Sequence, residues 1–215
     1  MSLSAAYSIV LLGLSLQAGS GATSTLTKDF HKFLDVVTFE DFVSPFLHTY
    51  QENEQFARSA DFLVSQRFND LLDELIASVY FEEYRNLLME HGVPAQLWLE
   101  KARAMTHKPP FPVPHPAEPE KTAALDKDFM PFIYNMMPYF ILTDIRDVYF
   151  YVSRTSVPFM DLLQFLASDE YKNTLSFLVE CPQYQALIDT LQDNGIDVLK
   201  IYNYLKREFE LADDY

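Results

Sequence analysis

The residue types that most often carry chemistry are present in this chain, but their spacing does not build a site. None of the histidines forms His-x-x-x-His or His-Glu-x-x-His, the spacings by which a helix binds zinc. Glycine-rich phosphate loops and the GxSxG nucleophile elbow are also absent from the sequence. The five histidines are His31, His48, His91, His107 and His115. The sequence therefore predicts no metal site and no cofactor.

Cysteine and paired carboxylates are the remaining sources of nucleophilic and acid–base chemistry. Cys181 is the single cysteine, so the chain forms no intramolecular disulfide, and its place before Pro182 predicts a small buried apolar residue rather than a nucleophile. Three carboxylate pairs fall on polar helix faces or in the acidic tail, where we interpret them as solvated. They are Asp73-Glu74, Glu82-Glu83 and Asp213-Asp214. No catalytic residue is predicted, and we expect a protein that is not an enzyme.

One stretch of the chain occurs twice, 103 positions apart. Residues 62–76 begin Phe-Leu-Val-Ser, and residues 165–179 begin Phe-Leu-Ala-Ser. From Phe68 and from Tyr171 the apolar residues recur at helical spacing, with Thr174 in place of Leu71 as the exception. Gly92 and Gly195 then stand at the same offset, each where a helix is expected to end. The sequence predicts two similar helical arrays.

Amphipathic windows run through both arrays, and the chain has only 5 glycines. We expect an all-α protein of about twelve helices, six in each array. In the first array Thr27 is the expected N-cap of the first helix, and Pro45 is expected to kink or delay the second, over about 40–51. A third helix is expected over about 54–65, a fourth over 68–79 and a fifth over 81–90. Residues 156–167 are apolar on most faces, which predicts burial on several sides.

The composition excludes several classes of function. A formal net charge of −15, spread evenly over both arrays, is opposite to the basic patch that nucleic-acid binding requires. Attraction to anionic membrane surfaces is disfavoured for the same reason. Beyond the N-terminal segment no window approaches the length of a transmembrane span. We expect no nucleic-acid partner and no stable membrane span.

The ends and the middle of the chain have distinct compositions. Residues 1–22 contain no charged side chain, and an apolar run too short to cross a bilayer is followed by small residues, so a signal peptide cleaved after Ala22 is predicted. The alternative is a buried N-terminal helix. Residues 108–125 are rich in proline and predict an extended linker. The predicted organisation is therefore signal peptide 1–22, repeat 23–107, linker 108–125 and repeat 126–215, in a secreted chain.

The apolar stripes are rich in Phe and Met as well as Leu. The simplest interpretation is the solid core of an all-α protein, since apolar helix stripes usually pack against one another. Met side chains also suit irregular apolar contacts. The alternative is a hollow between the two arrays that binds an apolar ligand.

The repeated pattern resembles the insect allergen-related repeat family, which includes cockroach group 1 allergens, mosquito midgut microvillar proteins and butterfly nitrile-specifier proteins. The residues that carry the resemblance are Phe-Leu-x-Ser-x-x-[Phe/Tyr], the apolar helix that follows, and [His/Asn]-Gly-[Val/Ile]. Asn194-Gly195-Ile196-Asp197-Val198 is the closer copy, whereas Gly92-Val93-Pro94-Ala95 lacks the Asp. The resemblance spans nearly all of the chain after residue 22.

The resemblance implies two bundles of about six helices that close into a shell around an apolar cavity. It also implies release into an insect gut, in the lumen or at the microvillar surface, and fatty acids or phospholipids as non-covalent ligands. Candidate lining residues follow from stripe position alone. They are Phe33, Phe42, Phe46, Leu72, Leu75, Phe129, Phe132, Met136, Met137, Phe140, Leu163, Leu175 and Leu178.

Two other functions stay open at this point. The nitrile-specifier branch of the family implies a detoxification role, for which the sequence holds no catalytic motif. Amphipathic helices also allow a membrane-active, cytolytic role, although membrane-lytic helices are usually basic on their polar face and this chain is acidic.

Overall fold

The computed structural model describes residues 25–36, 40–107, 129–137 and 142–208. Twelve α-helices and no β-strand lie in these ranges, which confirms the predicted all-α class. The predicted signal peptide and linker lie outside the described residues. The first six helices are α2 (Thr25–Asp35), α3 (Glu40–Glu52), α4 (Glu54–Leu63), α5 (Gln66–Ile76), α6 (Val79–Glu90) and α7 (Ala95–His107). The last six are α8 (Met130–Met136), α9 (Leu142–Thr155), α10 (Val157–Ala167), α11 (Asp169–Glu180), α12 (Pro182–Asp193) and α13 (Val198–Glu208).

The helices begin at corresponding positions in the two halves of the chain. Six N-cap side chains accept a hydrogen bond from the backbone N–H three residues further on, which satisfies one donor that the helix leaves unpaired. These caps occur in pairs that are 103 positions apart. The pairs are Asn53 and Ser156, Ser65 and Ser168, and Ser78 and Cys181.

The ends of α6 and α12 are also the same structure, built on a glycine with positive φ. Gly92 has φ 77° and Gly195 has φ 83°, a region that other residues adopt only with strain. The N–H of Val93 donates to the carbonyl of Leu88, and the N–H of Ile196 donates to Leu191, the long bond of a Schellman motif. Both helix ends therefore turn the chain in the same way, and the predicted role of these glycines is confirmed.

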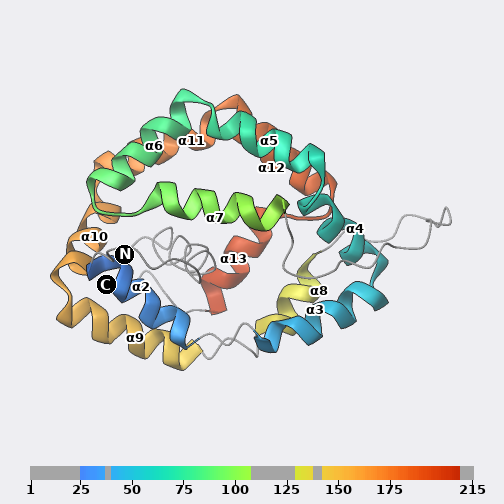
Figure 1. Ribbon diagram of the computed structural model, residues 1–215, viewed down its shortest axis with the longest axis horizontal. Coiled ribbons are helices and arrows are strands. Elements are labelled where there is room, and N and C mark those ends of the chain that lie inside the picture. The colour runs from blue at the N-terminus through green and yellow to red at the C-terminus, as the bar shows by residue number, and fades with distance from the viewer. Residues whose placement is uncertain (1–24, 37–39, 108–128, 138–141, 209–215) are drawn as a thin grey trace.

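Ten of the described helices follow one another around the periphery of the molecule, and α7 and α13 run across the middle (Figure 1). Helix α6 packs on α11 and α5 packs on α12, while α2 packs on α9 and α3 packs on α8. Each contact has a counterpart when the two halves are exchanged. This is the contact pattern of an approximate two-fold axis.

None of the described helices is long and apolar enough to cross a membrane.

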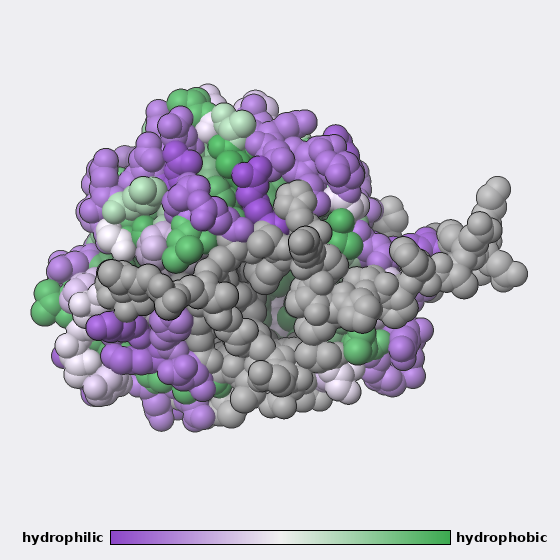
Figure 2. Space-filling model, in the orientation of Figure 1, coloured by the Kyte–Doolittle hydropathy of each residue, from purple (hydrophilic) through white to green (hydrophobic). Residues whose placement is uncertain are grey.

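Two groups of three helices lie at opposite sides of the molecule (Figure 1). The α2 end consists of α2, α9 and α10, and the α8 end consists of their counterparts α8, α3 and α4. Hydrophilic residues cover much of the peripheral helices on the visible face, with hydrophobic residues scattered among them (Figure 2).

Three local expectations were wrong. Helix α2 begins at Thr25, so Thr27 lies inside the helix and is buried rather than capping it. Helix α3 begins at Glu40 and runs to Glu52 with Pro45 inside it, so of the two effects expected of this proline, a kink or a delay, the delay does not occur. The expected helix over 68–79 divides at Ser78, whose hydroxyl caps α6. The periodicity did not predict this break, because the apolar pattern continues across it and only the cap residue marks it.

Candidate functional site

Eight of the thirteen predicted lining residues belong to three apolar clusters. Phe33, Leu163 and Leu175 belong to the cluster at the α2 end, which extends to Trp98 of α7. Leu75 and Leu178 belong to a second cluster, between α5, α11 and α12. Phe46 and Phe132 lie in the cluster of the α8 end, and Phe129 contacts both this cluster and the second one. Leu72 and Met137 are half-buried. Phe140 and the side chains of Phe42 and Met136 lie outside the described residues.

At the α8 end, aromatic rings surround Phe56 of α4. The ring centroid of Phe56 lies 4.4 Å from that of Phe132, 5.0 Å from that of Phe129 and 5.3 Å from that of Phe46. Phe56 itself is 1% exposed. The three phenylalanines beside it are half-buried, so the described part of the chain leaves some of the aromatic surface of this cluster exposed.

At the α2 end, rings surround Phe159 of α10, which is fully buried. Phe33 stacks on it at 5.8 Å, Phe30 contacts it edge-on at 6.4 Å, and Trp98 covers the far side of Phe30 at 5.1 Å. Phe30, Phe33 and Trp98 are all buried. Tyr149 contacts Phe159 as well, at 6.1 Å, and is half-buried, so most but not all of the rings of this cluster are buried.

A polar link closes the α2 end. The hydroxyl of Ser156 donates to the Asp29 carboxylate, and the Lys32 ammonium donates to the same carboxylate at 2.8 Å. Asp29 is 2% exposed, so the link ties α2 to the first turn of α10 inside the core. The Asp29 carboxylate is paired with both donors, Ser156 and Lys32, which indicates a structural rather than a catalytic arrangement.

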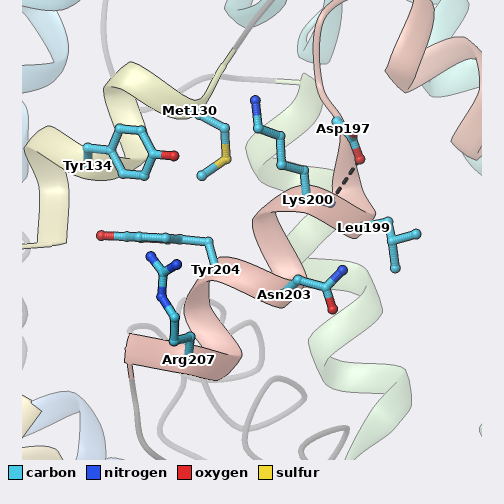
Figure 3. A pocket seen from close by; sticks show the side chains of 8 residues that line it. All are labelled: Met130, Tyr134, Asp197, Leu199, Lys200, Asn203, Tyr204 and Arg207. Carbon is cyan, nitrogen blue, oxygen red and sulfur yellow. Dashed lines mark hydrogen bonds between the residues drawn. The ribbon is translucent and has the colours of Figure 1, made fainter.

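A pocket of about 430 Å³ lies between α8 and α13 (Figure 3). Sequence reasoning missed it, although its α13 side is signalled by Lys200, Tyr204 and Arg207, which share one helix face at i, i+4 and i+7. Tyr204 meets Tyr134 of α8 edge-on at 4.8 Å, and the Arg207 guanidinium lies 5.3 Å from the centre of the Tyr204 ring. The lining residues are Met130, Tyr134, Asp197, Leu199, Lys200, Asn203, Tyr204 and Arg207.

Burial perturbs three tyrosines. Burial, together with the hydrogen bond that its hydroxyl donates to Asp61 Oδ1 at 2.7 Å, raises the pKa of Tyr50. Burial alone raises the pKa of Tyr149 and that of Tyr184. All three hydroxyls therefore stay protonated at neutral pH, and that of Tyr50 acts as a hydrogen-bond donor.

The remaining reactive residue types do not converge within the described part of the chain. Cys181 is 2% exposed, and its sulfur accepts from the N–H of Tyr184 at 3.5 Å as the cap of α12. The described residues contain no group of three or more His, Cys, Asp or Glu side chains placed to hold a metal ion. Asp73 and Glu82, members of the predicted solvated carboxylate pairs, are exposed and pair with Arg103 and Arg85.

Comparison with curated proteins and comparison with solved structures gave no match. A family model matches residues 25–202, and its description reads "Insect allergen related repeat, nitrile-specifier detoxification". The match begins at α2 and ends within α13, so it spans both sets of six helices. The chain belongs to the insect allergen related repeat family.

Proposed function

We propose that this protein is a secreted protein of the insect gut that binds fatty acids or phospholipids non-covalently in an apolar space between its two halves. Membership of the allergen-related repeat family supports the general assignment. The ligand class, the cavity and the site of release are proposals that extend it.

The observation that carries this proposal is the cluster at the α8 end, which leaves three phenylalanines half-buried around Phe56. Among the described residues, the apolar side chains form three clusters around a ring of helices. Tyr84 packs against the first and second clusters, and Phe129 packs against the second and third. Half-buried aromatic surface facing other apolar groups is suited to an apolar ligand.

The energy available to an acyl chain is large enough for stable binding. Each buried methylene contributes roughly 0.8 kcal/mol, so about twelve methylenes contribute about 10 kcal/mol before the cost of immobilising the chain. The candidate contacts at the α8 end are Phe46, Phe129 and Phe132, with Leu72 and Met137 as further half-buried candidates.

Organic extraction followed by mass spectrometry tests the proposal directly. The protein would be produced in insect cells, purified and extracted, and the extract compared with that of an unrelated secreted helical protein taken through the same steps. We expect fatty acids or phospholipids in a near-stoichiometric amount, and a higher melting temperature when fatty acid is added back. A clean extract with no gain in thermal stability would refute lipid binding and favour a solid core.

A second candidate function is specifier activity in glucosinolate detoxification, which the printed description of the family favours. Its test is the product distribution when a glucosinolate is hydrolysed by a plant myrosinase with and without the protein. A shift toward nitriles that depends on protein concentration would support it. If the products are the same with the protein as with a heat-denatured control, specifier activity is ruled out.

A further inference from the structure

The pocket between α8 and α13 joins positive charge to aromatic surface in a strongly acidic protein. We propose that it holds the anionic head group of a bound lipid, a carboxylate or a phosphate, while the acyl chain lies against the aromatic cluster of the α8 end. This inference rests on the proposed lipid-binding function and specifies the part of the ligand that the described pocket recognises.

The positive charge comes from one face of α13. Lys200 and Arg207 are two turns apart on this face, with the Tyr204 ring between them (Figure 3). The Arg207 guanidinium lies over the Tyr204 ring, and a guanidinium in that position directs its N–H groups sideways, where a carboxylate or phosphate accepts two hydrogen bonds. The phenol of Tyr134 is a further donor at the edge of the pocket.

Among the described residues that line the pocket, the carboxylate of Asp197 is directed to the start of α13. Asp197 Oδ1 accepts a hydrogen bond from the backbone N–H of Lys200 at 2.8 Å, in the manner of an N-cap. The positive end of the helix dipole partly compensates its charge. Arg207 lies ten residues further along, about 15 Å by the rise of a helix. The Arg207 end of the pocket is therefore the favourable place for an anion.

Helix α8 connects the pocket to the aromatic cluster. Met130 and Tyr134 line the pocket, whereas Phe129 and Phe132 of the same segment contact Phe56. Met130, which lines the pocket, is 1% exposed. A head group bound at α13 would thus be separated from the half-buried aromatic rings by the short helix α8. An amphipathic lipid requires a polar site and an apolar surface placed close together in this way.

The other half of the chain lacks this chemistry at the corresponding positions. At the 103-residue offset, Tyr134 corresponds to His31, Lys200 to Leu97, and Arg207 to Ala104. The charged pocket is therefore not a requirement of the repeated fold. The two-fold arrangement supplies two equivalent places, and only one of them carries the residues for an anion.

The test compares ligands that share one chain and differ in the head group. Dodecanoate, dodecyl phosphate and dodecanol are titrated calorimetrically into the delipidated full-length protein, the K200M/R207M variant and the control variant R67M/K172M. The control removes two positive charges from exposed positions on α5 and α11, so the net charge of the two variants is equal. Circular dichroism verifies that each variant is folded, and K200Q/R207Q serves as a second pair if the methionine variant is not.

We expect the wild-type protein to bind each anionic ligand roughly 10-fold or more tightly than dodecanol, as a charge-assisted hydrogen bond allows. In K200M/R207M this preference should fall to about one, with dodecanol affinity unchanged and the control unaffected. A preserved preference, or an equal loss for dodecanol, would overturn the head-group site. Inorganic phosphate that binds at this site as tightly as dodecyl phosphate would show a free-anion site instead. Failure of all three ligands to bind the wild type would overturn lipid binding itself.

Discussion

The α2 end and the α8 end are built from corresponding helices around a common aromatic centre, yet different residues surround that centre. Phe159 and Phe56 are 103 positions apart, and each is fully buried. Phe30 and Phe33 beside Phe159 are buried as well, whereas Phe46, Phe129 and Phe132 around Phe56 are half-buried. Tyr149, the counterpart of Phe46, lies 6.1 Å from Phe159 and is also half-buried. The same helix arrangement therefore supports a more buried or a less buried aromatic cluster, depending on which residues surround the centre.

Two substitutions between the halves account for the difference. The position of Asp29 in α2 is occupied by Phe132 in α8, so the buried polar link to Ser156 is replaced by a ring that packs on Phe56. The position of Trp98 in α7 is occupied by Ile201 in α13, so the large ring that covers Phe30 has no counterpart. The α2 end therefore holds a buried polar link where the α8 end holds a half-buried aromatic ring.

Truncation of the two central phenylalanines, Phe56 and Phe159, should give the largest difference in the free energy of unfolding between the two ends. Phe159→Ala is expected to lower the free energy of unfolding by about 4–5 kcal/mol, because its buried neighbours cannot collapse into the cavity. Phe56→Ala should cost about 3 kcal/mol, since its half-buried neighbours are able to shift. Urea unfolding followed by circular dichroism measures both, and Phe177→Ala, at a 60% exposed ring, is the matched control with a change below about 0.5 kcal/mol. An equal or larger loss for Phe56→Ala would contradict the view that the α8 end is the looser one.

Removing the buried carboxylate tests the polar link that closes the α2 end. Asp29→Ala should destabilise the protein by about 2 kcal/mol, since it leaves the Ser156 hydroxyl and α10 without their buried partner. Lys32→Ala should cost less than about 1 kcal/mol, because the Lys32 side chain is 41% exposed and its ion pair is screened. The measurement is again urea unfolding, with a double-mutant cycle between Asp29 and Ser156. Similar losses for Asp29→Ala and Lys32→Ala would place the stabilisation in the ion pair instead.

The repeat and its helix ends were predictable because they are local. Gly92 and Gly195 mark helix ends by their own conformational freedom, and the apolar stripes predict which faces are buried. The division at Ser78 was missed because a cap is a single residue inside a continuing pattern. The helix face that carries Lys200 and Arg207 could also be predicted from the sequence. The pocket could not, because its other side is formed by α8, about seventy residues earlier.

Which apolar residues line a cavity was not readable for a related reason. Phe33 and Phe46 both occupy apolar stripes, and both were candidates. Phe33 is covered by Phe159 and the rest of the α2 end, whereas Phe46 is left half-buried. Helical periodicity gives the direction of a side chain, and the neighbours that cover it come from distant parts of the chain.

The hydrogen bond between Tyr50 and Asp61 stabilises the α8 end. The α2 end has no counterpart of this bond, because Ser153 and Gln164 stand at the corresponding positions. Tyr50→Phe should cost about 1 kcal/mol at neutral pH. The raised pKa of Tyr50 means that the unfolded chain loses this proton first as pH rises, so wild-type stability should fall above about pH 10. In Tyr50→Phe that part of the fall disappears. Urea unfolding between pH 8 and 11 measures it, with Tyr80→Phe at an exposed ring as the control. Parallel pH profiles for wild type and Tyr50→Phe would contradict the assignment.

The smallest expected difference separates the caps of α6 and α12, which are Ser78 and Cys181. The hydroxyl of Ser78 accepts from the N–H of Phe81 at 3.2 Å, and the sulfur of Cys181 accepts from Tyr184 at 3.5 Å, where sulfur is the weaker acceptor. Ser78→Cys should therefore cost roughly 0.5–1 kcal/mol. Cys181→Ser should change stability by less than about 0.5 kcal/mol, because a stronger cap offsets the burial of a hydroxyl among Leu178 and Leu187. Urea midpoints resolve these values. A loss of about 2 kcal/mol in Cys181→Ser would mean that the sulfur stabilises α12 by apolar packing and that its role as a cap contributes little.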